Sequence, residues 1–297
     1  MKPRHSTIIG LATLALAGTA VADVYYSNFQ NIAIPANYAG VYLDVQTGAS
    51  NTNMFSPQAG WDINPYFGGS TLANSPGFQP VRSGTGSLDS VLNLSFGSTV
   101  GSGSTYSTFV QGPGGQNPGQ PGYGGSETHM GAGVGQFVSG TEGYLGFRLN
   151  GTDYGYMRVV LTNNSGGAVI KDWAYDTSGA SVVVGGIRQV GQDVILSSGF
   201  TLASAVINSG GATNLVKNGS GTNTLSATST FTGSTTVNDG KLLITGSLAN
   251  TSGVTVNDGA TLGGNGSIAG PVTLNSGATI SAGEGIDSLT TGSNTWN

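Results

Sequence analysis

Three phrases near the end of the chain are almost identical, and their spacing constrains the fold more than any other feature of the sequence. They are VNDGKLL (237–243), VNDGATL (256–262) and LNSGATI (274–280), and their glycines are 19 and 18 residues apart. A period near 20 residues is typical of stacked architectures in which each repeat contacts only its neighbours. The C-terminal part is therefore predicted to be a column of similar coils.

Within each phrase, apolar and polar residues alternate as they do in a short strand with one buried face. Val237, Val256 and Leu274 occupy equivalent places, so we expect them to stack in a core with coils about 4.8 Å apart. Weaker copies of the pattern precede them at 196–202 and 207–213. Glycine adopts a positive φ at little steric cost. The predicted turn glycines at the corners are Gly240, Gly259 and Gly277.

The two positions before each turn glycine are polar. The first is asparagine in all three phrases, and amides stacked at this spacing can hydrogen-bond along a column. The sequence therefore predicts a structural ladder of Asn238, Asn257 and Asn275. The second is Asp239 in the first phrase and Asp258 in the next. On adjacent coils these two residues would lie about 5 Å apart, which is near the separation of the two carboxyl groups in retaining glycosidases. Aspartate is also a common turn residue, and the third phrase has Ser276 there. We interpret both aspartates as turn residues, with a polysaccharide-active enzyme as the less favoured alternative.

The N-terminus has the pattern of a secretory signal peptide. Basic residues at positions 2 and 4 precede an apolar run over 8–17, and small residues lead to an A-x-A cleavage site at 20–22. About ten apolar residues are too few to span a bilayer. Residues 1–22 are therefore predicted to be removed, so that the mature chain begins at Asp23 in a secreted or cell-surface protein. An N-terminal anchor helix is the alternative.

Composition narrows the class of protein further. Glycine supplies 52 of 297 residues, charged residues are 8% of the chain, and cysteine is absent. This composition favours short strands and turns and excludes disulfides and thiolate metal sites. Loss of the basic residues at positions 2 and 4 takes the formal net charge from −5 to −7. An acidic chain lacks the basic surface that nucleic-acid binding needs, and no segment after residue 22 is long and apolar enough to span a membrane.

Aromatic residues divide the chain into two predicted domains. Residues 23–187 contain nearly all of them and are predicted to form an antiparallel β-sandwich or jelly roll, whereas residues 188–297 contain the repeat. The stretch QGPGGQNPGQPGYGGS (111–126) is too poor in apolar side chains to offset the entropy of ordering. We interpret it as a mobile surface loop of the first domain, with an interdomain linker as the alternative.

Alternating residues predict several strands in the first domain. A hairpin is expected from 143–149 and 154–162, joined by the turn NGTD (150–153), and further strands are expected at 168–176 and 181–187. An earlier pair of strands is predicted at YAGVYLDVQ (38–46) and VLNLSF (91–96). The whole chain is thus expected to be all-β.

Residues from about 214 to 292 resemble the autotransporter-associated β-strand repeat, also called the passenger-associated transport repeat. The most specific segment is GSGTNTLSATSTFTGSTTVNDGKL (219–242), in which Phe231 stands where the family often has tyrosine. The closing ISAGEGIDSLT (280–290) has Ala282 where the family usually has proline. The resemblance implies a right-handed parallel β-helix in a surface-exposed or secreted bacterial protein.

The first domain resembles secreted bacterial proteins that often carry a PEP-CTERM sorting tail, through GYLGFR (143–148), YGYMRV (154–159) and DWAYD (172–176). That family is largely without assigned function, so this likeness implies a fold and a location only. The chain ends at 293–297 with neither a sorting tail nor the membrane barrel of classical autotransporters. We expect a truncated gene product, with a partner that covers the open end of the β-helix as the alternative.

Side chains suited to catalysis or metal binding are scarce. His129 is the one histidine after residue 22, and it lies beside the stretch rich in glycine and proline, where no rigid triad is expected. Asp62 and Asn64 could offer oxygen ligands to Ca²⁺, but we interpret them as turn residues. GGNGSIAG (263–270) lacks the aspartate of calcium-binding repeats. We therefore predict no enzyme activity, no metal and no cofactor.

Aromatic side chains are the best candidates for contact with a partner. Tyr154 and Tyr156 alternate with Met157 and Val159, so one face of the hairpin is expected to be aromatic and exposed to solvent. The possible carbohydrate contacts are Tyr154, Tyr156, Trp61 and Trp173, with packing inside the sandwich as the alternative. The leading hypothesis is a non-enzymatic structural passenger with a β-helical stalk. The second is a carbohydrate-binding module, and the partner would be an extracellular glycan or a surface protein.

Overall fold

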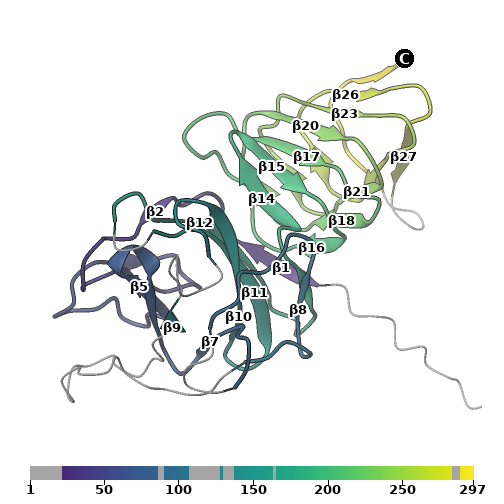
Figure 1. The fold of residues 1–297 in the computed structure, drawn as a ribbon. Coiled ribbons are helices and arrows are strands. Elements are labelled where there is room, and N and C mark those ends of the chain that lie inside the picture. Colours follow the sequence, from purple (N-terminus) through teal and green to yellow (C-terminus); the bar gives the residue numbers. More distant parts are fainter. Residues whose placement is uncertain (1–21, 86–89, 107–127, 130–136, 163–164, 283–287) are drawn as a thin grey trace, which may run out of the picture.

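The computed structural model describes residues 22–85, 90–106, 128–129, 137–162, 165–282 and 288–297. The predicted signal peptide, apart from Ala22, and the stretch 111–126 lie outside these residues. The described part of the chain is all-β as predicted, and its one helical element is the short 3₁₀ helix η1 (Phe67–Gly69). Figure 1 shows the N-terminal sheets on one side and a stack of parallel coils on the other.

Two larger antiparallel sheets make up most of the N-terminal part. The long strands of the first are β10 (Glu142–Leu149), β11 (Asp153–Val160) and β12 (Val169–Asp176), flanked by β7 (Phe78–Pro80), β2 (Ile32–Ala33) and β1 (Asp23–Tyr26). The second contains, in order, β4 (Ser50–Asn51), β3 (Tyr42–Leu43), β5 (Ile63–Tyr66), β6 (Thr71–Asn74) and β9 (Thr128–His129). An apolar cluster that includes Leu43, Ile63, Phe147 and Met157 joins the two sheets. This arrangement agrees with the predicted antiparallel sandwich.

The predicted hairpin is formed by β10 and β11, which pair from Glu142 and Val160 to Leu149 and Asp153. Its turn places Asn150 and Gly151 at φ values of 51° and 83°, as an Asn-Gly turn requires. The prediction for 181–187 holds only in part, because β13 is limited to Val182–Val183 and pairs with β8 (Thr99–Val100).

The strands predicted at 38–46 and 91–96 form only in part. The first contains β3, which pairs with β4 and β5. Residues 91–96 make two isolated bridges, from Val91 to Arg82 and from Asn93 to Leu145. Both segments contain alternating apolar residues, and alternation sets which side chains are buried without setting the partner strand.

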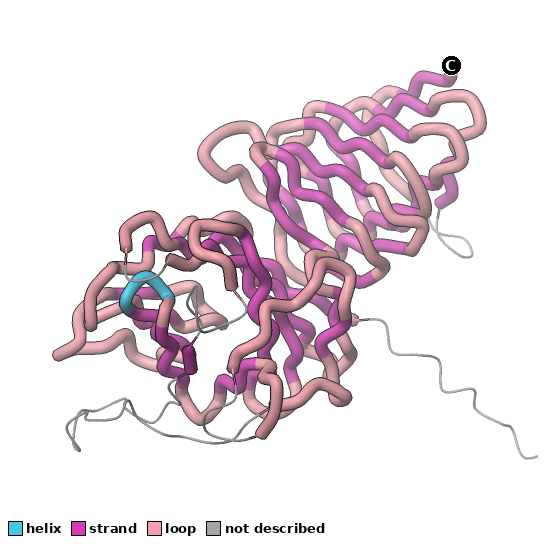
Figure 2. Tube along the Cα trace, viewed as in Figure 1, coloured by secondary structure: helices cyan, strands magenta, loops and turns pink. Residues whose placement is uncertain are grey.

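The C-terminal part is a parallel β-solenoid of about five turns with three faces (Figure 2). The first face begins with β14 (Ile187–Val190), which pairs antiparallel with β15 (Asp193–Leu196). It continues in parallel through β17 (Asn214–Lys217), β20 (Ser234–Val237), β23 (Gly253–Val256), β26 (Val272–Leu274) and β28 (Asn294–Trp296). The second contains β16 (Phe200–Leu202), β18 (Thr222–Leu225), β21 (Lys241–Ile244), β24 (Thr261–Gly264) and β27 (Thr279–Ala282). The third contains β19 (Thr228–Ser229), β22 (Ser247–Leu248) and β25 (Ser267–Ile268).

Repeated apolar positions explain why these coils stack. Val237, Val256 and Leu274 are in parallel register on successive strands and are at most 1% exposed. Phe231 is fully buried in the same interior cluster. Residues 207–213, one of the weaker copies, form no strand. Each coil thus covers its apolar side chains with those of its neighbours, which is the basis of solenoid stability.

The first strand joins the two parts of the molecule. One edge of β1 pairs antiparallel with β12, where Val24 lies opposite Asp176. The other edge pairs parallel with β16, where Asp23 lies opposite Thr201. The β1 strand lies between the two parts in Figure 1 and makes their main sheet continuous. The domain boundary predicted between residues 187 and 188 falls inside β14 and stays a prediction.

Candidate functional site

A column of asparagine side chains runs along one corner of the solenoid. The Nδ2 of Asn238 donates to Oδ1 of Asn218 at 2.8 Å, that of Asn257 to Asn238 at 2.6 Å, and that of Asn275 to Asn257 at 2.8 Å. Asn297 continues the column by donating to Asn275 at 3.1 Å. The three predicted residues thus lie in a ladder of five. Asn218 was missed because its turn, NGSG, differs from the repeated phrase.

The corner beside this ladder depends on glycine and aspartate. The φ values of Gly240, Gly259 and Gly277 are 68°, 74° and 82°. A Cβ atom at Gly240 would also lie 2.5 Å from the carbonyl oxygen of Gly219 on the preceding coil, so a larger residue fits only if the backbone moves. Asp239 accepts the N–H of Gly240 at 2.7 Å, as a turn residue does. Both Asp239 and Asp258 are exposed.

A lysine interrupts the apolar interior of the solenoid. Lys217 pairs in register with Leu196 and Val237, and its side chain is fully buried. Its ammonium donates to the carbonyl oxygens of Gly219 and, at 3.1 Å, Asp239. Burial lowers the pKa of Lys217, and the negative charge of Asp239 opposes this effect. The same coil contains Asn223, whose buried Oδ1 has no hydrogen-bond partner.

A buried ionic cluster lies where the sandwich meets the solenoid. Arg158 on β11 donates from Nε to Asp172 Oδ1 at 2.9 Å and from Nη2 to Oδ2 at 2.5 Å. Tyr26 on β1 donates to Asp172 at 2.9 Å, and the N–H of Gln189 on β14 donates to the same carboxylate at 3.2 Å. Burial and the charge of Asp172 raise the pKa of Tyr26 well above its usual value, so the phenol stays protonated. The cluster therefore links four strands, β1, β11, β12 and β14.

Sequence reasoning missed this junction cluster, although a signal was available. Arg158 and Asp172 are directly opposite in the pairing of β11 with β12, and charged residues inside apolar strands are unusual in a chain with 8% charge. Burial raises the pKa of Asp172, and the guanidinium of Arg158 opposes the shift. A buried charge of this kind persists when a partner of opposite charge is present.

The expectation that Tyr154 and Tyr156 face solvent is wrong. Their exposed fractions are 8% and 2%, because β8 and β13 pack against β11 and Tyr106 stacks on Tyr154. The hydroxyl of Tyr156 donates to the carbonyl oxygen of Ile187 and accepts its N–H at 2.9 Å. Trp173 is 1% exposed and donates to the carbonyl oxygen of Val45 at 2.8 Å. Of the predicted carbohydrate contacts, Trp61 alone keeps partial exposure, and it packs against Tyr42.

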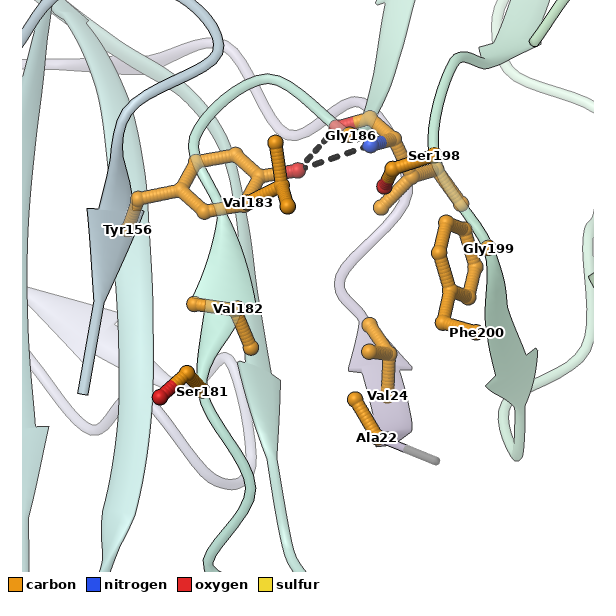
Figure 3. A pocket seen from close by; sticks show the side chains of 11 residues that line it. Ala22, Val24, Tyr156, Ser181, Val182, Val183, Gly186, Ser198, Gly199 and Phe200 are labelled. Atoms are coloured by element: carbon orange, nitrogen blue, oxygen red, sulfur yellow. Dashed lines mark hydrogen bonds between the residues drawn. The ribbon is translucent and has the colours of Figure 1, made fainter. Parts of the chain in front are cut away.

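Two small hollows lie near these aromatics. The first, of about 30 Å³, lies between Val24, Tyr156, Val182 and Phe200 at the junction (Figure 3). The second, of about 50 Å³, is bordered by Tyr25, Thr47 and the edge of Trp173. Ligand pockets usually have several hundred Å³, so these hollows fit water molecules and no sugar ring.

The other residues considered for chemistry have structural contacts. Asp62 accepts the N–H of Val45 at 2.9 Å, and Asn64 donates to the carbonyl oxygen of Ala39 at 3.2 Å, so the two side chains serve different loops. His129 lies in β9 opposite Thr71. Over the described residues, no group of three or more histidine, cysteine or acidic side chains could hold a metal ion. None of the helices described there is long and apolar enough to cross a membrane.

The solenoid region is similar to one known protein family. Residues 215–244 match the Passenger-associated-transport-repeat family. The segment runs from β17 to β21 and includes Phe231 and the first VNDG corner. The match and the parallel solenoid confirm the resemblance predicted for the repeat. No curated protein and no solved structure matches the chain. The likeness of the N-terminal part to PEP-CTERM-type proteins stays a prediction.

Proposed function

We propose that the chain is an exported, non-enzymatic structural passenger in which the solenoid is a stalk and the sandwich is held rigidly at one end of it. The passenger-associated transport repeat at 215–244 supports export to the cell surface or beyond. The observation that carries the stalk role is the continuous sheet, because β1 is hydrogen-bonded to β12 on one edge and to β16 on the other. Five coils at a spacing of about 4.8 Å would span roughly 24 Å.

The partner predicted from the sequence, an extracellular glycan or a surface protein, belongs to this proposal. Burial of Tyr154, Tyr156 and Trp173 leaves only Trp61 partly exposed among the predicted contacts, so the surface-protein alternative is the stronger one. The asparagine ladder supports a load-bearing role, because it adds side-chain hydrogen bonds between successive coils to those of the backbone.

Export is tested by expressing the full chain in a bacterium and treating intact cells and the medium with protease and antibody. We expect the protein outside the cytoplasm, without residues 1–22. A matched variant, Leu14→Arg, interrupts the apolar run of the leader and should leave the protein inside the cell. Equal cytoplasmic retention of both chains would contradict the proposal.

A further inference from the structure

The backbone nitrogen of Asp23 contacts a buried carboxylate. It donates to Oδ1 of Asp176 at 2.6 Å, and Asp176 is fully buried at the end of β12. The other donors to this carboxylate are the N–H and hydroxyl of Ser178, at 2.9 and 2.8 Å, and the N–H of Ala180, at 2.6 Å. All four donors are electrically neutral while residue 22 is attached. None of the three salt bridges among the described residues includes Asp176.

A fully buried carboxylate usually has a cationic partner, because neutral donors replace only part of its hydration. Asp23 is also the residue that follows the A-x-A sequence at 20–22. We propose that removal of the leader between Ala22 and Asp23 turns this nitrogen into an α-ammonium group that forms a buried ion pair with Asp176. The inference rests on the export proposed above, since it needs a leader-removing protease.

The covalent step is hydrolysis of one peptide bond. Water adds across the bond between the carbonyl carbon of Ala22 and the nitrogen of Asp23, which leaves a carboxyl group on the released leader and an amine on Asp23. Near pH 7 the carboxyl group loses a proton and the amine takes one up, since an α-amino group has a pKa of about 7.7–8. The contact, which already has a charged acceptor, thereby becomes an ion pair between an ammonium donor and the Asp176 carboxylate.

The surroundings hold the new amine in place. The carbonyl oxygen of Asp23 accepts the N–H of Thr177 at 3.1 Å. Asp23 is therefore also hydrogen-bonded to the residue that follows Asp176. Val24, the next residue, pairs with Asp176 in the sheet. The ion pair would therefore fix the end of β1, the strand that joins the sandwich to the solenoid.

Cleavage also removes Ala22 from the interior apolar cluster, together with one hydrogen bond. The carbonyl oxygen of Ala22 accepts the N–H of Thr201 at 2.8 Å, and this bond is lost with the leader. Ala22 borders the 30 Å³ hollow of Figure 3, which has room for a water molecule. A water there can accept the freed N–H.

The test compares two chains that differ by one residue. One begins at Asp23 with a free amine, and the other retains Ala22, which moves the charge away from Asp176. Each chain is made in two forms, one with Asp176 and one with Asp176→Asn, and the Tm of all four proteins is measured by thermal unfolding. With Asp176 present, we expect the chain that begins at Asp23 to have a Tm about 3–6 °C higher. With Asp176→Asn this advantage should disappear, whereas with Asp258→Asn, an exposed control, it should persist.

An advantage of the same size with Asp176→Asn, or no advantage in the native background, would overturn the ion pair. A second measurement needs no variant at Asp176, which protects the test if Asp176→Asn fails to fold. The α-amine of the chain that begins at Asp23 should react with acetic anhydride at least ten times more slowly than that of the chain with Ala22. Equal rates in the folded proteins would also overturn the inference.

Failure of the ion pair and failure of export give different results. Mass spectrometry of the protein recovered outside the cell reports whether its first residue is Asp23, which tests processing. The two purified chains test the contact with Asp176 whether or not the cell removes the leader at that bond.

Discussion

Arg158 and Asp172 form a buried bidentate ion pair, with Nε···Oδ1 and Nη2···Oδ2 distances of 2.9 and 2.5 Å. Both residues belong to the sandwich, but the guanidinium also donates to the carbonyl oxygen of Gln189, and Asp172 accepts the Gln189 N–H. The pair therefore holds the first solenoid strand, β14, against the sandwich. Removal of one partner would leave an unpaired charge at this junction.

Arg158→Met should lower the free energy of unfolding by about 3–5 kcal/mol, because Asp172 loses its counter-ion in a buried site. The matched control is Lys171→Met, which breaks the partly exposed contact of Lys171 with Glu142 at 2.6 Å. Such a pair contributes at most about 1 kcal/mol. Urea unfolding of the two variants measures both values, and equal losses would contradict the role of the buried pair.

The double variant Arg158→Met with Asp172→Leu separates charge from packing. Replacement of a buried ion pair by apolar side chains is often neutral or stabilising. We expect the double variant to recover most of the stability lost in Arg158→Met, measured in the same urea titration. If it is no more stable than Arg158→Met alone, the loss comes from packing or from the contacts with Gln189.

The asparagine ladder predicts a dependence on position. Asn257 both donates to Asn238 and accepts from Asn275, whereas Asn297 makes one ladder contact, to Asn275. Asn257→Ala should therefore cost more than Asn297→Ala, by about 1 kcal/mol in the free energy of unfolding. Thermal unfolding of the two variants tests this, and an equal cost would mean that the side-chain column adds nothing to backbone pairing.

The repeat region could be predicted because the chemistry there is local. Each VNDG phrase places a buried valine, an asparagine of the ladder and a glycine corner in four residues, and the next coil repeats the arrangement. The junction could not be predicted in this way. Pairing of Val24 with Asp176 joins residues 152 positions apart in the chain, and no periodic pattern marks it. Alternation around Tyr156 correctly separates two faces of β11, but it does not say that β8, β13 and Ile187 cover one of them.

Lys217 predicts a pH effect of unusual sign. Its pKa is lowered from 10.5 by burial, so the folded state disfavours the charged form. The cost is fully present below the folded pKa and disappears as pH rises toward 10.5, where the side chain is neutral in both states. Lys217→Met removes the group from a column otherwise filled by Leu196 and Val237. We expect this variant to be more stable than the native chain at pH 7, with the gap closing as pH rises toward 10.5. A gap that stays constant over this range in thermal scans would show that the ammonium is not penalised.

Asp62 predicts the corresponding effect in acid. Burial raises its pKa from 3.8 to about 6, against the opposing hydrogen bond from Val45, and the charge of Asp44 adds to the rise. Below pH 3.8 the carboxyl group is protonated in both states and carries no penalty, so its contribution to stability is lost as pH rises through about 6. Asp62→Asn keeps an oxygen that can accept the Val45 N–H and has no charge to bury. The variant should therefore gain on the native chain by about 1–2 kcal/mol between pH 4 and pH 7, a value reduced for partial access of solvent. Denaturant unfolding at the two pH values measures the gain, and an unchanged difference would show that Asp62 is not penalised by its burial.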